Sequence, residues 1–289
     1  MKKAIFGPAG NSDSFTAKYK SFKDIAKYVS EMGLDAFEYQ FGRGVRMSEK
    51  NASIIKDECI KYNVKISAHA PYYISLASDE EEKRNNSLRY ILETAKAVKN
   101  MGGNRIVVHS GSIGKKSREE AFMLAKETLA KSISYLDSSG YGDVVICPET
   151  MGKINQLGSL YEVLDFCKLD ERIIPCIDFG HLNARTHGSI KYKEDYAKIL
   201  DAVENSIGIY RTKIFHAHFS KIEYTAGGEK RHLTFEDREY GPDPQMLMEL
   251  ISERNLTPVI ICESNGTQAE DALAMKYMYE NYNTIREDN

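Results

Sequence analysis

Short apolar runs recur along the chain, and six of them end on a residue that can bind a metal ion. These runs span residues 64–69, 106–109, 144–149, 175–178, 214–218 and 259–263, and they end on His69, His109, Glu149, Asp178, His218 and Glu263. The end residues follow one another at intervals of 29 to 45 residues. Because a strand, a loop and a return helix need about 30 residues or more, this spacing predicts successive βα units.

Two further strands are predicted near the start of the chain, at residues 4–6 and 36–39. A loop of turn-forming residues (7–12) follows the first strand, and a loop with glycine and arginine (40–45) follows the second. Apolar residues at helical spacing predict eight helices after the strands. The expected helices span residues 21–32, 48–62, 79–101, 117–136, 159–167, 192–207, 244–254 and 268–282.

Eight strands therefore alternate with eight helices, and no linker or low-complexity segment separates them. Few architectures satisfy this alternation, so we predict an α/β fold: one closed (β/α)8 barrel, or TIM barrel, that occupies residues 1–289 as a single domain. The polar, glycine-bearing segment 220–241 follows the seventh strand. It is expected to be a long loop insertion, of the kind on which function often depends.

Composition narrows the class of protein only slightly. A chain of 289 residues with 42% hydrophobic and 28% charged residues is ordinary for a soluble protein with a large core. The formal net charge of −3 argues against a generally basic nucleic-acid binder. It leaves open a local basic patch around a cleft whose acidic groups are neutralised by metal ions.

The cysteines indicate a reducing compartment. There are five, without a CxxC pair, and Cys147, Cys176 and Cys262 lie inside apolar strand runs, where a free thiol behaves as a small hydrophobic group. No apolar run approaches the ~20 residues needed to cross a bilayer, and the first residues lack the apolar core of a signal peptide. We therefore expect a soluble, cytoplasmic, monomeric protein without a membrane partner.

The residues at the strand ends indicate a metal centre. Active sites of (β/α)8 barrels lie at the C-terminal ends of the strands, so three imidazoles and three carboxylates should converge there. Such groups cannot all be buried unpaired, and divalent cations compensate their charge. Nitrogen and oxygen ligands without thiolate favour Zn²⁺ or Mn²⁺. Six ligands exceed the need of one tetrahedral ion, which predicts two metals that share a bridging carboxylate and activate water for attack on a phosphoryl group.

Two other histidines are interpreted differently. His216 lies two residues before His218 and therefore on the same face of the strand, so it is expected deeper in the barrel, where it packs or supports a ligand. His187 lies in a loop and is expected at the surface.

Five segments resemble endonuclease IV (AP endonuclease family 2), which belongs to the superfamily of xylose isomerase-like TIM barrels. They are residues 69–76 (HAPYYISL), 108–111 (VHSG), 148–150 (PET), 178–181 (DFGH) and 261–264 (ICES). The resemblance covers nearly the whole chain in the same order. Its specific part is the combination of His69 and His109 with the HAPY loop, since the Glu/Asp/His/Glu set is shared with sugar isomerases.

The resemblance implies two or three Zn²⁺ ions, held by His69, His109, Glu149, Asp178, His181, His218, His232 and Glu263. Glu149 would bridge two ions, and Glu149 and Glu263 would be the catalytic carboxylates.

The third zinc site departs from the family pattern. Lys230 stands where the family has an aspartate, although His181 and His232 match the other two ligands. The third site is therefore either absent or completed by Glu229 or Asp237. The loop at 7–10, Gly-Pro-Ala-Gly, also differs from the usual GxH-type sequence.

The resemblance further implies a DNA-repair hydrolase that acts on double-stranded DNA. Such an enzyme cleaves the backbone 5′ to an abasic site, by attack of a metal-bridging hydroxide, and leaves a 3′-hydroxyl. Tyr72 matches the residue that fills the vacated base stack, and Arg43 is a candidate minor-groove contact. A loop aromatic that only shields the metal cleft is an equal interpretation of Tyr72.

Two other functions stay open. A sugar isomerase or epimerase of the same superfamily would use one Mn²⁺ or similar ion on the Glu/Asp/His/Glu set, with two carboxylates that transfer protons. The acidic net charge and Lys230 favour it, whereas His69, His109 and Tyr72 favour the nuclease. A non-catalytic binding barrel is disfavoured by the complete ring of ligands.

Overall fold

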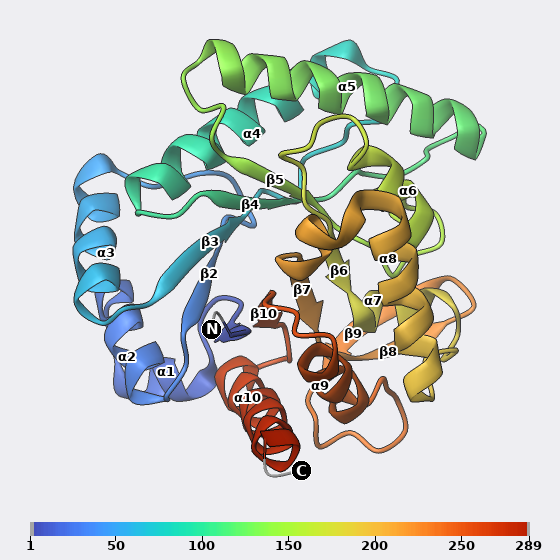
Figure 1. The fold of residues 1–289 in the computed structure, drawn as a ribbon. Helices are drawn as coiled ribbons and strands as arrows, with labels where there is room; N and C mark the ends of the chain where they lie inside the picture. The colour runs from blue at the N-terminus through green and yellow to red at the C-terminus, as the bar shows by residue number, and fades with distance from the viewer. Residues whose placement is uncertain (1–2, 288–289) are drawn as a thin grey trace.

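Eight parallel strands form the centre of the molecule, in a computed structural model that describes residues 3–287 (Figure 1). One half-sheet contains, in order, β1 (Ile5–Pro8), β10 (Val259–Cys262), β7 (His216–Phe219) and β6 (Cys176–Asp178). The other contains β2 (Ala36–Gln40), β3 (Lys65–His69), β4 (Arg105–Val108) and β5 (Val145–Pro148).

Two parallel bridges close the half-sheets into a barrel. Ala9 pairs with Glu38 between β1 and β2, and Glu149 pairs with Cys176 between β5 and β6. The strands therefore follow one another around the barrel in chain order, and β10 completes the circle beside β1. The predicted (β/α)8 TIM barrel is confirmed.

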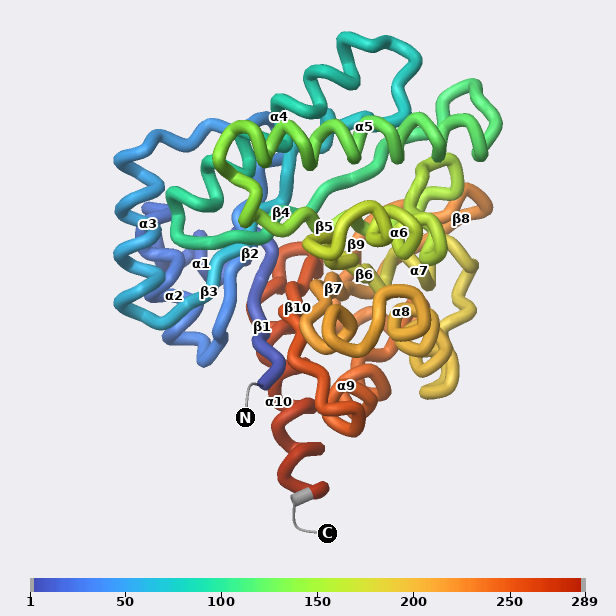
Figure 2. The backbone as a smooth tube through the Cα atoms, turned by 45° about the horizontal axis from the view of Figure 1, so that its top comes forward, coloured from blue at the N-terminus to red at the C-terminus, as the bar shows by residue number. Residues whose placement is uncertain are grey.

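Helices surround the strands (Figure 1), and all eight predicted helices are present. They are η1 with α2 (Phe22–Asp24 and Ile25–Glu31), α3 (Glu49–Lys61), α4 (Glu81–Asn100), α5 (Arg118–Ser138), α6 (Leu160–Phe166), α8 (Lys193–Lys213), α9 (Pro244–Glu253) and α10 (Gln268–Glu287). Two short helices were not predicted, α1 (Asp13–Lys18) and α7 (Phe179–Arg185). Figure 2 shows the end of α10 and the start of β1 at the same end of the barrel, at the bottom of the view.

Helix α7 forms because Asp178 acts as its N-cap. The Asp178 Oδ1 atom accepts a hydrogen bond from the His181 backbone N–H at 2.7 Å, which satisfies a free donor in the first turn. Strand β6 therefore passes directly into a helix. This short helix was not predicted, and it places His181 near the strand ends.

The segment 220–241 is not only the irregular insertion that we predicted. Its first part is a hairpin of β8 (Lys221–Thr225) and β9 (Gly228–Leu233), paired antiparallel. Two consecutive glycines lie at the turn, and Gly228 has φ +89°, a left-handed conformation that favours glycine. The Glu229 N–H also donates to the Gly152 carbonyl at 3.1 Å, which docks the hairpin on the loop after β5.

The hydrophobic core lies between the strands and the helices. Phe6 of β1 is fully buried, and its ring packs against Tyr279 of α10 at a centroid distance of 5.6 Å. All five cysteines are buried free thiols, including the three inside apolar strand runs, Cys147, Cys176 and Cys262. Among residues 3–287, no helix is both long and apolar enough to cross a membrane.

The seam between β1 and β2 yields a stability prediction. A Cβ atom on Gly7 would lie 1.8 Å from the Ala36 carbonyl oxygen, so a Gly7→Ala substitution forces the two strands apart. We expect the free energy of unfolding to fall by about 1–3 kcal/mol, the usual cost of overpacking. Gly227→Ala is the control, because its Cβ would meet nothing closer than 3.8 Å. Chemical denaturation checks both variants, and equal midpoints would contradict the proposed close approach.

Candidate metal centre

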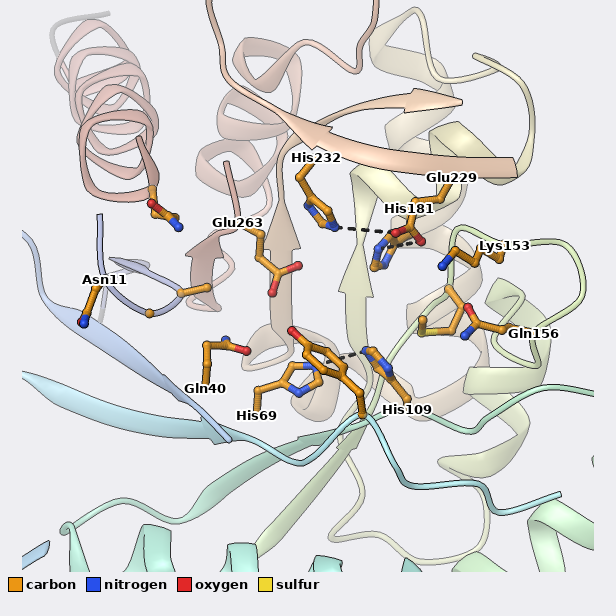
Figure 3. Close-up of a pocket in the computed structure, with 15 residues that line it drawn as sticks. Asn11, Gln40, His69, His109, Lys153, Gln156, His181, Glu229, His232 and Glu263 are labelled. Atoms are coloured by element: carbon orange, nitrogen blue, oxygen red, sulfur yellow. Dashed lines mark hydrogen bonds and ion pairs between the residues drawn. The ribbon is translucent and has the colours of Figure 1, made fainter. Parts of the chain in front are cut away.

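A cavity of about 610 Å³ opens at the C-terminal ends of the strands (Figure 3). Its walls are mainly polar, and its polar lining residues are Asn11, Gln40, His69, Tyr72, His109, Lys153, Gln156, His181, Glu229, His232, Glu263 and Gln268. The end residues of the six apolar runs lie in the last residues of a strand or one residue beyond it. His69, His109 and Glu263 line the cavity, and Glu149, Asp178 and His218 are fully buried. The barrel therefore brings these six side chains together, although they are far apart in the sequence.

Glu149 lies between two clusters of ligand-type atoms. Its Oε2 atom is 3.2 Å from His69 Nε2 and 2.8 Å from His109 Nε2. Its Oε1 atom is 2.9 Å from His218 Nδ1, on the other side of the carboxylate. The two oxygens of one carboxylate thus face different partners, which is the arrangement expected of a residue that bridges two cations.

The second cluster contains Glu149, Asp178, His218 and Glu263, whose ligand atoms all lie within 4.8 Å of one another. The Glu263 Oε1 atom is 3.5 Å from His218 Nδ1. Asp178 is fully buried, and its Oδ2 atom has no hydrogen-bond partner among the described residues. Burial raises the pKa of Asp178 to about 6.

The other carboxylates are held in the charged form by histidines. Burial opposes ionisation of Glu263, but the attraction of His218 prevails and lowers the pKa of Glu263 to about 2. Burial also opposes ionisation of Glu149, and His218 and His109 hold its pKa well below the usual range. A concentration of buried carboxylates, one of which has an oxygen that accepts no hydrogen bond, fits divalent cations, because each added positive charge offsets the cost of burial.

Local hydrogen bonds decide which nitrogen of each ring faces the cavity. The His69 Nδ1 atom donates to the Ala70 carbonyl at 2.7 Å, so Nε2 is left with a lone pair. The His181 Nδ1 atom is 3.0 Å from the Thr150 carbonyl, and its Nε2 atom likewise faces the cavity. Both rings therefore present Nε2 as the ligand atom.

A third cluster contains His181, Glu229 and His232, from helix α7 and the hairpin (Figure 3). The Glu229 Oε2 atom is 3.3 Å from His181 Nε2, and the Oε1 atom is 3.9 Å from His232 Nε2. Of the two substitutes that we considered for the missing aspartate, the structure brings Glu229 to this cluster. Lys230 points elsewhere and pairs with Glu223 at 2.5 Å.

Asp237 does not reach the third cluster. Its Oδ1 atom accepts hydrogen bonds from the backbone N–H groups of Glu239 and Tyr240, at 2.9 and 2.7 Å, and so stabilises the turn after the hairpin. His187 is exposed, with φ +52°, as expected of a loop residue.

Tyr72 lies at the rim of the cavity, next to the first cluster. Its side chain is 58% exposed, and its ring centroid is 5.4 Å from that of His69 and 5.5 Å from that of His109. Arg43 is exposed on the neighbouring loop and lines a separate hollow, which shares Gln40 with the main cavity. The structure therefore brings Tyr72 to the site and leaves Arg43 beside it.

Sequence reasoning missed Glu38, a fully buried carboxylate near the site. Its Oε1 and Oε2 atoms lie 2.9 Å from His218 Nε2 and 3.0 Å from His216 Nε2. Burial opposes its ionisation, but the two histidines hold the pKa of Glu38 well below the usual range. One signal was present: an acidic residue in the middle of the apolar strand 36–39. His216 is fully buried below His218, at the depth we expected.

The barrel and its clusters define a class of protein: barrel enzymes with histidine and carboxylate ligands at the strand ends. The chain belongs to the family of xylose isomerase-like TIM barrels, whose sequence profile matches residues 26–280. The superfamily that the motifs indicated is thereby confirmed.

The relatives of this chain include a protein without an assigned function and proteins named as endonucleases. An uncharacterised protein of Methanocaldococcus jannaschii is 36% identical over 272 residues, which cover 94% of this chain and 96% of that protein. A probable endonuclease 4 of Finegoldia magna is 28% identical over 270 residues, covering 89% of this chain and 92% of the relative.

Solved structures with the same fold come from two kinds of enzyme. A D-tagatose 3-epimerase-like protein has a TM-score of 0.73 at 22% identity and covers 98% of each chain. Endonuclease IV from Thermus thermophilus has a TM-score of 0.69 at 17% identity and covers 96% of this chain and 98% of that one. At these identities the similarity shows the fold alone.

The third cluster yields a prediction about metal content. After reconstitution with Zn²⁺ and gel filtration, the Glu229→Gln variant should carry one ion fewer per chain than the wild type, because the amide lacks the negative charge that attracts the cation. Asp237→Asn is the matched control and should keep the wild-type content, since Asp237 binds only backbone N–H groups. Plasma emission spectroscopy measures both. Loss of zinc from the Asp237 variant alone would reverse the assignment.

Proposed function

We propose that this protein is a zinc-dependent DNA-repair phosphodiesterase that cleaves the backbone 5′ to abasic sites in double-stranded DNA. The observation that carries the proposal is the position of Glu149, whose two carboxylate oxygens face two different ligand clusters. Sites in which two metal ions share a carboxylate suit displacement at phosphorus, because the attacking and leaving oxygens can both be stabilised.

The additional clusters support the same proposal. A sugar isomerase with one ion needs only the cluster of Glu149, Asp178, His218 and Glu263. This chain adds His69 and His109 on one side, and the cluster of His181, Glu229 and His232 on the other. Its relative of similar length in Finegoldia magna is named a probable endonuclease 4, which agrees with this interpretation.

Chain residues supply position and charge in the proposed reaction. Bound Zn²⁺ would supply Lewis acidity toward phosphate oxygens and a water that loses its proton near neutral pH. Glu149 and Glu263 would hold the ions, since both carboxylates stay charged at neutral pH. Tyr72, exposed at the rim, would stack in the gap left by the missing base.

The surface near Tyr72 suits the DNA backbone. Arg43 and Arg46 lie together on the loop after β2, beside the main cavity. This local positive charge compensates for the net charge of −3 in the approach of a phosphate backbone.

A second candidate, a sugar epimerase with one metal ion, is favoured by one observation. The amides of Asn11, Gln40, Gln156 and Gln268 line the cavity, and such groups suit the hydroxyls of a small polyol. The similarity of the fold to a D-tagatose 3-epimerase-like protein agrees with it.

One experiment separates the two candidates. Zinc-reconstituted protein is incubated with a labelled duplex that contains one tetrahydrofuran abasic analogue, and a manganese-reconstituted sample is incubated with a ketose panel. We expect a nick 5′ to the analogue and none in the undamaged duplex. An intact duplex together with epimerised ketose would replace the first proposal by the second.

The bridging role of Glu149 yields a further prediction. The Glu149→Gln variant should cleave the abasic duplex at least about 100-fold more slowly, because loss of a residue that only supports a ligand already costs ~10–100-fold. Glu249→Gln is the control, since Glu249 pairs with Lys193 on the outer helices. Single-turnover rates measure both, and undiminished cleavage by the Glu149 variant would remove the bridging role.

A further inference from the structure

Glu38 is a buried carboxylate to which the proposed reaction assigns no part. It lies on β2 with no exposed surface, and the Ser67 hydroxyl donates a hydrogen bond to its Oε2 atom at 2.8 Å. In the part of the chain that the structure describes, its close ionic contacts are the two histidines of β7, His216 and His218, and no lysine or arginine pairs with it. A buried carboxylate without such a cation costs several kcal/mol unless another group compensates it.

The contact with His218 connects Glu38 to the metal centre. The two nitrogens of His218 point in opposite directions: Nε2 lies 2.9 Å from Glu38 Oε1, and Nδ1 lies 2.9 Å from Glu149 Oε1. An imidazole can bind a metal through one nitrogen while the other keeps its proton. The carboxylate of Glu38 favours the proton on Nε2, which leaves the lone pair of Nδ1 directed at the cluster with Glu149.

We propose that Glu38 is a positioning residue of the metal centre, whose negative charge attracts the Nε2 side of the His218 ring and leaves Nδ1 as the nitrogen that binds the ion. A carboxylate behind a metal-binding histidine fixes the orientation of the ring and increases the basicity of the ligand atom. Glu38 acts on the ion only through His218. This role does not depend on the substrate, so it is separate from the proposed cleavage of DNA.

The surroundings of Glu38 distinguish this role from packing. The Nε2 atoms of His216 and His218 are not aligned for linear hydrogen bonds to the carboxylate, so the attraction at 2.9–3.0 Å is mainly electrostatic. An isosteric amide would fill the same space without the charge. Cys176 is another buried neighbour of these two rings, and its thiol is only a weak hydrogen-bond partner.

The first measurement is metal affinity. Glu38→Gln protein is titrated against a chromophoric chelator with Zn²⁺, and one ion per chain should bind about 10–100-fold more weakly than in the wild type. Glu249→Gln is the matched control, because it makes the same change of charge on the outer helices, where Glu249 pairs with Lys193. It should bind zinc as the wild type does.

The second measurement separates positioning from structural support. Protein loaded with Co²⁺ has d–d absorption bands that depend on the ligand field, so Glu38→Gln should shift these bands even where its thermal stability equals that of the wild type. A residue needed only for packing would lower the melting temperature and leave the bands unchanged.

The proposal can be tested whether or not the Glu38→Gln variant folds. Wild-type zinc affinity and an unchanged cobalt spectrum in Glu38→Gln would overturn it, and so would an equal loss of affinity in Glu249→Gln. If Glu38→Gln does not fold, Ser67→Ala takes its place, since it disturbs the carboxylate through one hydrogen bond. The zinc affinity of Ser67→Ala should then fall measurably, but by less than about 10-fold. An affinity equal to that of the wild type would overturn the proposal.

Discussion

The free-energy cost of burying negative charge determines which groups can lie together at the C-terminal ends of the strands. Glu38, Glu149 and Asp178 have no exposed surface, and Glu263 lies just above them. Each desolvated carboxylate costs several kcal/mol without a counter-charge, and the described chain offers histidines but no lysine or arginine for this purpose. Cations supplied from solution are the remaining compensation. The barrel therefore gathers buried carboxylates and histidines at a place where a divalent cation would be stabilised.

The sequence predicted the barrel because the same signal was repeated eight times. Each strand end combines an apolar run with a helix at the expected distance, so an error in one unit does not alter the fold. The ligand ring was predictable for the same reason, since (β/α)8 topology places all strand ends at one edge. Single features were harder to predict. Helix α7 depends on one capping contact of Asp178, and the hairpin depends on two glycines inside a polar segment.

The contacts of Glu38 could not be predicted from the sequence, because they form only in the tertiary structure. A glutamate on a strand of four or five residues is ordinary when the other face is solvated, and only the closed barrel shows that this side chain points at the histidines of β7. The identity of the third residue in the outer cluster was open for a similar reason. Glu229 and Asp237 are both near His232 in the sequence, and the register of the hairpin decides between them.

The docking of the hairpin on the loop after β5 has a consequence for how such enzymes diverge. His181, Glu229 and His232 come from a short helix and a hairpin outside the ring of strands, whereas the other two clusters are built from the strand ends themselves. The outer cluster can therefore be altered or lost by exchanging the hairpin, which carries two of its three residues, and the barrel stays unchanged. A lineage could pass between sugar and nucleic-acid chemistry in this way without rebuilding its centre.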